Sequence, residues 1–137
     1  MRSILLILYL FCFSLQAEIY VVTNKDNNSI NALNKPFLKD IFFDRRRFSA
    51  DGKAITPLDQ DKKGETYKEF YQKLVNMSQR KLKKYWMKKV FTGQATPPKS
   101  VQSDKQVISY ILNNMNAVGY IQAEAMSDSL KIIYIIE

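Results

Sequence analysis

The five residues Lys62-Lys63-Gly64-Glu65-Thr66 have the types and spacing of a general anion site, because they join an expected strand to an expected helix. The first N–H groups of a helix have no partner within the helix, and a flexible glycine beside them leaves them open to a ligand. Glu65, however, places a negative charge where an anion would sit, and its carboxylate can itself interact with the positive end of the helix dipole. These residues alone leave two interpretations open, an anion site and an ordinary start of a helix.

Catalytic and metal chemistry have little support in the rest of the chain. The 137 residues include no histidine, which excludes Ser-His and Cys-His catalysis and His-ligated metal sites. The spacing of Asp40, Asp44 and Asp51 is not that of a calcium-binding loop. Asp59 and Asp61 are not expected to form a general acid–base pair. We therefore expect a protein that is not an enzyme and that needs no cofactor and no metal.

Positive charge dominates the composition, since 21 Lys+Arg residues outnumber 13 Asp+Glu residues and give a net charge of +8. The densest basic concentration lies on one expected helix, at Arg80, Lys81, Lys83, Lys84, Lys88 and Lys89. Helical spacing predicts a buried stripe of Leu82, Tyr85, Trp86 and Val90, opposite Lys81, Lys84 and Lys88. The basic side is either a solvated face or a patch for an acidic partner or an anionic lipid surface. Nucleic acid is not expected, because no recognition motif is present.

A second basic group, Arg45-Arg46-Arg47, follows a helix that is expected to end near Phe43. Cations at the carboxyl end of a helix interact favourably with the helix dipole, which would be a structural role. Guanidinium groups also bind phosphate or carboxylate with two hydrogen bonds, which would make the group a clamp. Both roles remain open from the sequence.

Residues 1–17 are expected to be a secretory signal peptide. Arg2 supplies the positive charge, residues 4–13 the apolar stretch, and Ala17 the small residue at the cut. Cys12, the only cysteine, lies inside this stretch, so the mature domain of residues 18–137 would contain no disulfide. Cleavage would leave 120 residues with a net charge of +7, in an export compartment, most simply a bacterial periplasm. A retained N-terminal anchor is the alternative.

The pattern of the remaining chain predicts one α/β domain. Strands are expected at residues 18–23, 54–58, 118–121 and 130–136, where β-branched and aromatic residues gather. Helices are expected after Pro36, at 66–75, from the cap Ser78 to 90 or 91, and from the cap Ser103 to about 115. Spacing places most of the larger aromatic side chains in the core: Tyr67, Phe70, Tyr71, Tyr85, Trp86 and Phe91. This order of elements predicts a mostly parallel or mixed sheet covered by helices.

Several short motifs occur in the order found in a known family. Residues 37–43, 55–70 and 116–120 resemble landmarks of the phosphate-binding proteins of ABC phosphate transporters and of the wider periplasmic binding protein superfamily. Five further motifs resemble a subgroup of single-lobe proteins: Pro57-Leu58-Asp59-Gln60, Glu69-Phe70-Tyr71, Tyr85-Trp86, Val90-Phe91-Thr92-Gly93 and Pro97-Pro98. The resemblance covers residues 19–136 and implies a single three-layer lobe of the periplasmic-binding-protein type, with a mixed sheet flanked by helices.

The resemblance also implies where a ligand would bind. Phosphate binders of this family use a Ser-Gly-Thr turn at a helix start, preceded by an arginine. Here Gly64-Glu65-Thr66 stands at the turn and Asp59-Gln60 stands in the arginine region, so Gln60, Gly64 and Thr66 are the candidate ligand-binding residues. Acidic groups replace donors in both places, so phosphate affinity is expected to be lower than in those proteins.

Two functions remain open from the sequence. The first is binding of phosphate or another small anion for transport or sensing, together with an ABC permease; the family resemblance and the charge of +7 favour it. The second is an envelope protein-interaction module that has lost ligand binding, which Glu65 and Asp59 favour. A chain of this size supplies about one lobe, so a homodimer could complete the site. Peripheral contact with a membrane is also compatible with the basic helix.

Overall fold

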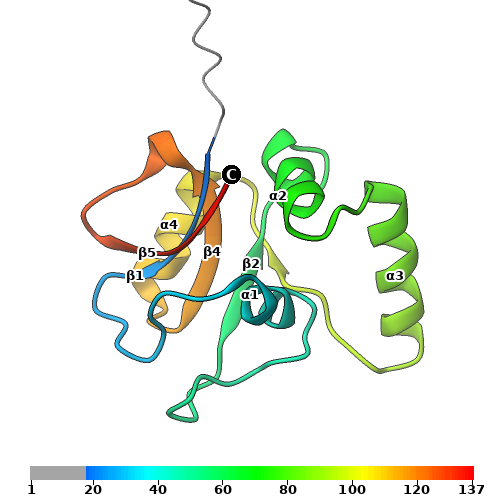
Figure 1. Cartoon of the computed structure of the whole chain (residues 1–137), viewed down its shortest axis with the longest axis horizontal. Helices are drawn as coiled ribbons and strands as arrows, with labels where there is room; N and C mark the ends of the chain where they lie inside the picture. The colour runs from blue at the N-terminus through cyan, green and yellow to red at the C-terminus, as the bar shows by residue number, and fades with distance from the viewer. Residues whose placement is uncertain (1–17) are drawn as a thin grey trace, which may run out of the picture.

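The computed structural model describes residues 18–137, so the expected signal segment and Cys12 lie outside the described residues. Within the described part, no helix is both long enough and apolar enough to cross a membrane. The described residues form alternating strands and helices around one sheet (Figure 1).

The sheet of the described residues has five strands in the order β3-β2-β4-β1-β5. The strands are β1 (Ile19–Asn24), β2 (Thr56–Asp59), β3 (Lys99–Ser100), β4 (Ala117–Gln122) and β5 (Leu130–Ile136). β2 is parallel to both β3 and β4, whereas β1 is antiparallel to β4 and β5. The predicted mixed sheet is therefore confirmed.

Three helices of the described residues begin at a side chain that caps them. They are α1 (Lys35–Phe42), α2 (Glu65–Val75), α3 (Gln79–Phe91), α4 (Asp104–Asn113) and the short 3₁₀ helix η1 (Ala123–Ala125). The side chains of Asn34, Ser78 and Ser103 accept a hydrogen bond from the third residue after each of them, at the starts of α1, α3 and α4. Gly93, with a φ of 67°, follows the end of α3. The expected helices are confirmed to within one or two residues.

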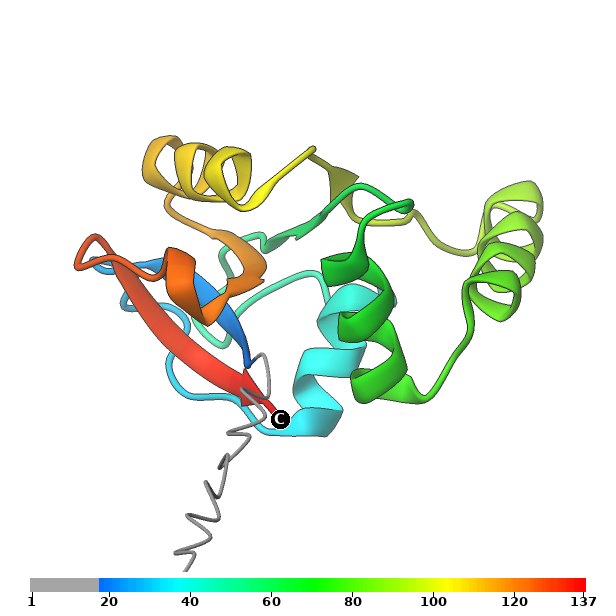
Figure 2. The same cartoon turned by 90° about the horizontal axis from the view of Figure 1, so that it is seen from above.

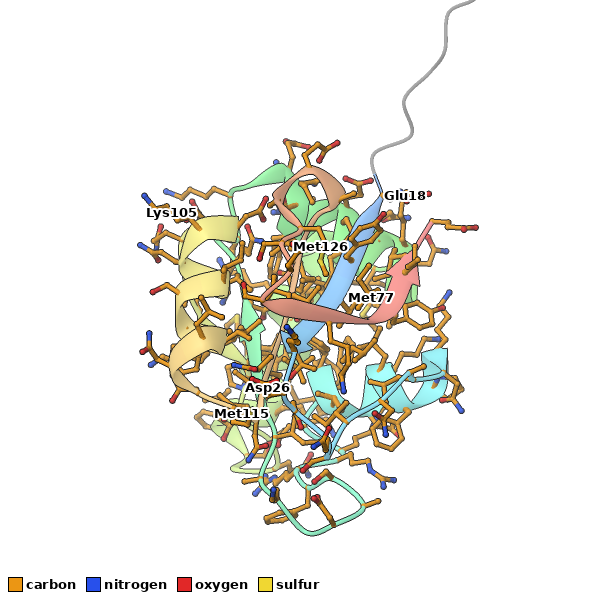
Figure 3. All side chains as sticks on the ribbon, turned by 90° about the vertical axis from the view of Figure 1, so that its left-hand side faces the viewer. Glu18, Asp26, Met77, Lys105, Met115 and Met126 are labelled. Atoms are coloured by element: carbon orange, nitrogen blue, oxygen red, sulfur yellow. The ribbon has the colours of Figure 1, made fainter. Side chains whose placement is uncertain are left out.

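The helices cover both faces of the sheet, which makes three layers (Figure 2). One core combines α1, α2 and α3 with the face that carries Val21, Val118 and Tyr120. The other combines α4 with the opposite face, where Val107 and Ile111 pack on neighbours of β1, β2 and β4. Figure 3 looks onto the α4 side, with Lys105 and Met115 near the two ends of that helix. This is the expected α/β lobe.

α3 stands at the end of the molecule away from β1 and β5 (Figures 1 and 2). Leu82 and Trp86 are 1% and 6% exposed and join it to the core, and the Trp86 ring stacks on that of Phe43 with centroids 5.9 Å apart. The expectation that Val90 and Phe91 are buried is wrong, because they are 54% and 93% exposed. No other element of the described residues packs closely on these two side chains.

Two strand expectations also change. β2 begins at Thr56 rather than at residue 54, since Ala54 forms an isolated antiparallel bridge with Phe48 instead. β3 was not expected at all. It follows Pro97-Pro98 directly and is two residues long, so pairing with Leu58 and Asp59 of β2 defines it rather than any local pattern.

Candidate functional site at the carboxyl edge of the sheet

Parallel strands bring the candidate residues to one edge of the sheet. β2 ends at Asp59, β4 ends at Gln122, and the two strands run in the same direction. α2 starts shortly after β2, and α4 starts shortly after β3, so the N-termini of both helices lie at this same edge. In open α/β sheets, ligands bind in the crevice outside the carboxyl ends of the strands, where neighbouring connections diverge. We refer to this region as the carboxyl edge.

The start of α2 lacks a side-chain cap. Gly64 is the N-cap residue, and its own N–H donates to the carbonyl of Asp61 at 2.9 Å. A Cβ at Gly64 would come within 3.2 Å of that carbonyl oxygen, so a side chain would crowd this turn. Glu65 lies in the first turn, where its carboxylate is 3.4 Å from Lys68 Nζ. The half-buried Thr66 accepts a hydrogen bond from Gln122 Nε2 at 3.1 Å.

Gln60 is held inside the protein by its own neighbours. It is 5% exposed, and its amide Nε2 donates to the Tyr120 carbonyl at 2.8 Å and to Asp104 Oδ1 at 2.6 Å. The other oxygen of Asp104 accepts from the Gln122 backbone N–H at 3.4 Å. Asp104 therefore places a carboxylate at the carboxyl edge. This carboxylate accepts the hydrogen bond that the Gln60 amide would otherwise be able to donate to a bound anion.

These contacts connect two of the three predicted site residues. Gln60 bonds Asp104, Asp104 bonds Gln122, and Gln122 bonds Thr66. Gly64 is two residues from Thr66 at the start of the same helix. Asp104 and Gln122 were not predicted. A sequence signal for Asp104 exists, since it is an acidic residue directly after the helix cap Ser103, but its distance from Gln60 in the chain conceals the contact.

A buried carboxylate lies directly beside this network. Asp59 is 3% exposed, and its Oδ1 accepts hydrogen bonds from the hydroxyls of Tyr71 at 2.7 Å and Tyr120 at 3.1 Å. Burial raises the pKa of Asp59 from 3.8 to about 7, although both hydrogen bonds and the charge of Lys62 act in the opposite direction. Burial likewise raises the pKa of Tyr71 and Tyr120 well above 10.0.

The arginine group has partners within the chain. Arg45 Nε lies 3.0 Å from Asp40, and Arg46 lies over the Phe37 ring at 4.1 Å from its centroid. Arg47 donates to both carboxylate oxygens of Asp44, at 2.9 and 2.8 Å. Asp44 also accepts from the N–H of Thr96 at 2.8 Å, which ties the segment after α3 to the end of α1. These contacts account for the three arginines structurally.

Among residues 18–137 no group of three or more His, Cys, Asp or Glu side chains could hold a metal ion. No triad of a nucleophile, a base and an orienting group is present in this part of the chain, which has neither histidine nor cysteine. The contacts observed at the carboxyl edge are hydrogen bonds to carboxylate, amide and hydroxyl groups.

No protein-family model matches the chain, and neither does any curated protein sequence. Solved structures do match. An ABC-type phosphate transport receptor from Vibrio cholerae superposes with a TM-score of 0.68 at 17% identity, over 85% of this chain and 45% of the receptor. A Clostridium perfringens protein described as a putative phosphate ABC transporter substrate-binding protein, with bound phosphate, superposes with a TM-score of 0.67 at 18% identity. The match covers 85% of this chain and 44% of that protein. PstS from Borrelia burgdorferi superposes with a TM-score of 0.65 at 15% identity, over 85% of this chain and 46% of PstS.

The likeness is one of fold, because the identities are low. The chain spans less than half the length of each of these proteins, while they match most of this chain. The Vibrio cholerae protein is described as a transport receptor and the Clostridium perfringens protein as a substrate-binding protein. The chain therefore has the fold of a single lobe of the substrate-binding proteins of phosphate ABC transporters.

Proposed function

We propose that this chain is an exported, non-enzymatic binding lobe that binds a small oxyanion, with phosphate as the first one to test, at the start of α2. The observation that carries the proposal is the uncapped N-terminus at Gly64, which lies at the carboxyl edge of a phosphate-receptor fold. Lys62 and Lys63 come directly before it. The signal-like residues 1–17 support export, and the structural neighbours are themselves binding proteins.

The start of α2 can hold an oxyanion in three ways. Backbone N–H groups of the first turn point along the helix axis, and the dipole places partial positive charge there. Thr66 Oγ1 accepts from Gln122 and keeps its own hydrogen to donate to a ligand oxygen. Lys62 and Lys63 are exposed and supply attraction. Because a single lobe encloses a ligand on one side, the affinity is expected to be lower than in a protein that closes two lobes.

A second candidate function rests on Asp104. Its carboxylate already accepts the Gln60 amide and the Gln122 N–H, which are donors an oxyanion would use. A carboxylate at this place also repels an incoming anion. This arrangement favours a lobe that carries its own internal anion and that binds another protein instead of a solute.

Titration with phosphate in a thermal-shift assay separates the two functions. A ligand at about 100 times its dissociation constant adds about 2.7 kcal/mol to the free energy of unfolding. A saturable shift with phosphate, absent with chloride at the same ionic strength and lost in Thr66→Val, is expected for oxyanion binding. Sulfate tests selectivity among oxyanions.

Asp104→Asn supplies the decisive comparison, because it removes the charge while keeping an oxygen and a similar shape. No shift in the wild type together with a saturable shift in Asp104→Asn would support the second function. Equal small shifts with all salts in every variant would mean screening of a basic surface, and would refute the oxyanion site.

A further inference from the structure

A hollow lies between the loop that precedes α2 and the outer end of α3, and it shares Lys62 and Lys63 with the surroundings of the proposed oxyanion site. It has a volume of about 740 Å³, within the range of about 300–1,000 Å³ that is usual for ligand pockets. Its apolar lining includes Trp86, Met87, Val90 and Phe91. We call this hollow the α2–α3 groove. It is concave, and its walls come from different segments of the chain.

The apolar wall of the groove is unusually exposed. Phe91, Met87 and Val90 are 93%, 65% and 54% exposed, and they lie together on the last turns of α3. Leu82 and Trp86 already attach α3 to the core, so these three side chains are not needed to hold the helix in place. Contiguous apolar side chains left in water beside a hollow are typical of an interaction site.

The charged lining of the groove has one sign. Lys62, Lys63 and Lys83 line it, and no aspartate or glutamate does. Within residues 18–137, none of these three lysines forms an ion pair. A partner that covers the groove gains most if it brings carboxylates to the three lysines and apolar side chains to the wall of α3.

Trp86 differs from the other apolar side chains of the groove. Its ring lines the groove and is 6% exposed, and its Nε1–H has no acceptor among the described residues. A buried N–H without an acceptor costs free energy, and the indole nitrogen can only donate. Because the nitrogen itself is enclosed by the protein, this donor is not part of the surface that a partner would meet.

We propose that the α2–α3 groove is a docking site for an acidic, amphipathic segment of another protein. A second copy of this chain is disfavoured as the occupant, since its net charge of +8 would bring like charges to the lysines. A lipid surface is disfavoured because it is flat, whereas the groove is a hollow into which a peptide segment can insert side chains. The proposal goes beyond oxyanion binding, because the groove is mainly apolar and Thr66 does not line it.

Selection from a library of random dodecapeptides displayed on phage, against the purified protein, tests the proposal without assuming a partner. We expect the enriched peptides to combine Asp or Glu with Phe, Leu or Trp. Synthetic copies of them that lack tryptophan are then titrated while the emission of Trp86 is followed. Trp86 is the only tryptophan in the chain and lines the groove, so a saturable change reports binding there.

Matched variants locate the binding. Phe91→Ser and Lys83→Glu are each expected to weaken binding about tenfold or more, because apolar anchors and buried charge pairs carry much of the binding energy. Leu112→Ser and Lys84→Glu likewise replace an apolar side chain with serine and a lysine with glutamate, at exposed positions outside the groove. They should leave the affinity within about twofold. Affinity should also fall as salt is added.

Five results would overturn the proposal. Selection without enrichment, or enrichment of peptides that lack acidic residues, contradicts the expected chemistry. Equal losses in the groove variants and in the matched variants contradict the location. Stronger Phe91-dependent binding to phosphatidylglycerol vesicles than to the peptides would identify a lipid surface as the occupant. Self-association abolished by Phe91→Ser would identify a second copy.

Discussion

Replacing Asp59 with asparagine is expected to remove most of a dependence of stability on pH between about pH 4 and pH 7. The carboxyl is 3% exposed, and burial raises its pKa from 3.8 to about 7 in the folded protein. Because the folded state holds the proton more tightly than the unfolded state does, Asp59 contributes stability that is fully present below pH 3.8. That contribution is lost as the pH rises through about 7.

The magnitude follows from the size of the pKa shift. A shift from 3.8 to about 7 corresponds to about 4 kcal/mol, since each unit of pKa shift is worth about 1.4 kcal/mol. Domains of this size have free energies of unfolding of about 5–15 kcal/mol, so the effect should be easy to measure. The amide introduced by Asp59→Asn keeps an oxygen that can accept from Tyr71 and Tyr120, both of which donate to the same oxygen of Asp59.

Urea denaturation at several pH values, followed by Trp86 fluorescence and by circular dichroism, gives the free energy of unfolding of both proteins. The difference between wild type and Asp59→Asn isolates Asp59 from the other titrating groups. Asp128→Asn, which removes an exposed carboxylate, is the control for the change in net charge. A difference between wild type and Asp59→Asn that stays constant from pH 4 to pH 8 would refute the buried-carboxyl argument.

Three further substitutions test the packing, the capping and the surface electrostatics. Gly119→Ala should lower the free energy of unfolding by about 1–3 kcal/mol, because the added Cβ would lie 2.5 Å from Val107 Cγ1. Adding Val107→Ala to this variant should restore part of the lost stability, and thermal denaturation measures both effects. The Ser103 hydroxyl caps α4 by accepting a hydrogen bond from the Gln106 N–H at 3.2 Å. Ser103→Ala should therefore lower the free energy of unfolding by about 1 kcal/mol, as measured by urea denaturation, and a loss near zero would count against the cap. Hydrogen bonds from two serines lower the pKa of Asp51, so Asp51→Asn should destabilise the protein at neutral pH and progressively less as the pH falls into the acidic range; an effect that grows on acidification would contradict this sign.

The helices were predictable because their signals are local. Pro36, Ser78 and Ser103 mark helix starts through a fixed φ or through their own side chains, and the apolar spacing after them needs no knowledge of distant residues. Strands β1, β4 and β5 were predictable from runs of β-branched and aromatic residues. β3 was not, since two residues carry no pattern and become a strand only through pairing with β2.

Helical spacing also misjudged one end of α3. The spacing correctly gave Leu82 and Trp86 to the core, and it gave Val90 the same place because it lies one turn further along. Burial, however, depends on whether another element lies opposite, and no other element of the described residues packs closely on Val90 and Phe91. The exposure of Phe91, at 93%, and the groove beside it are consequences of that arrangement.

By itself, the sequence determined the α/β class, the caps and the position of Gly64 and Thr66 at the start of a helix, because each depends on neighbours a few residues away. Only the tertiary structure decided that Asp104 meets Gln60 and that Gln122 meets Thr66, since parallel pairing of β2 with β4 brings those chain segments to one edge. The raised pKa of Asp59 has the same origin. Desolvation is caused by every residue that packs around a carboxyl, and those residues are assembled only when the chain folds.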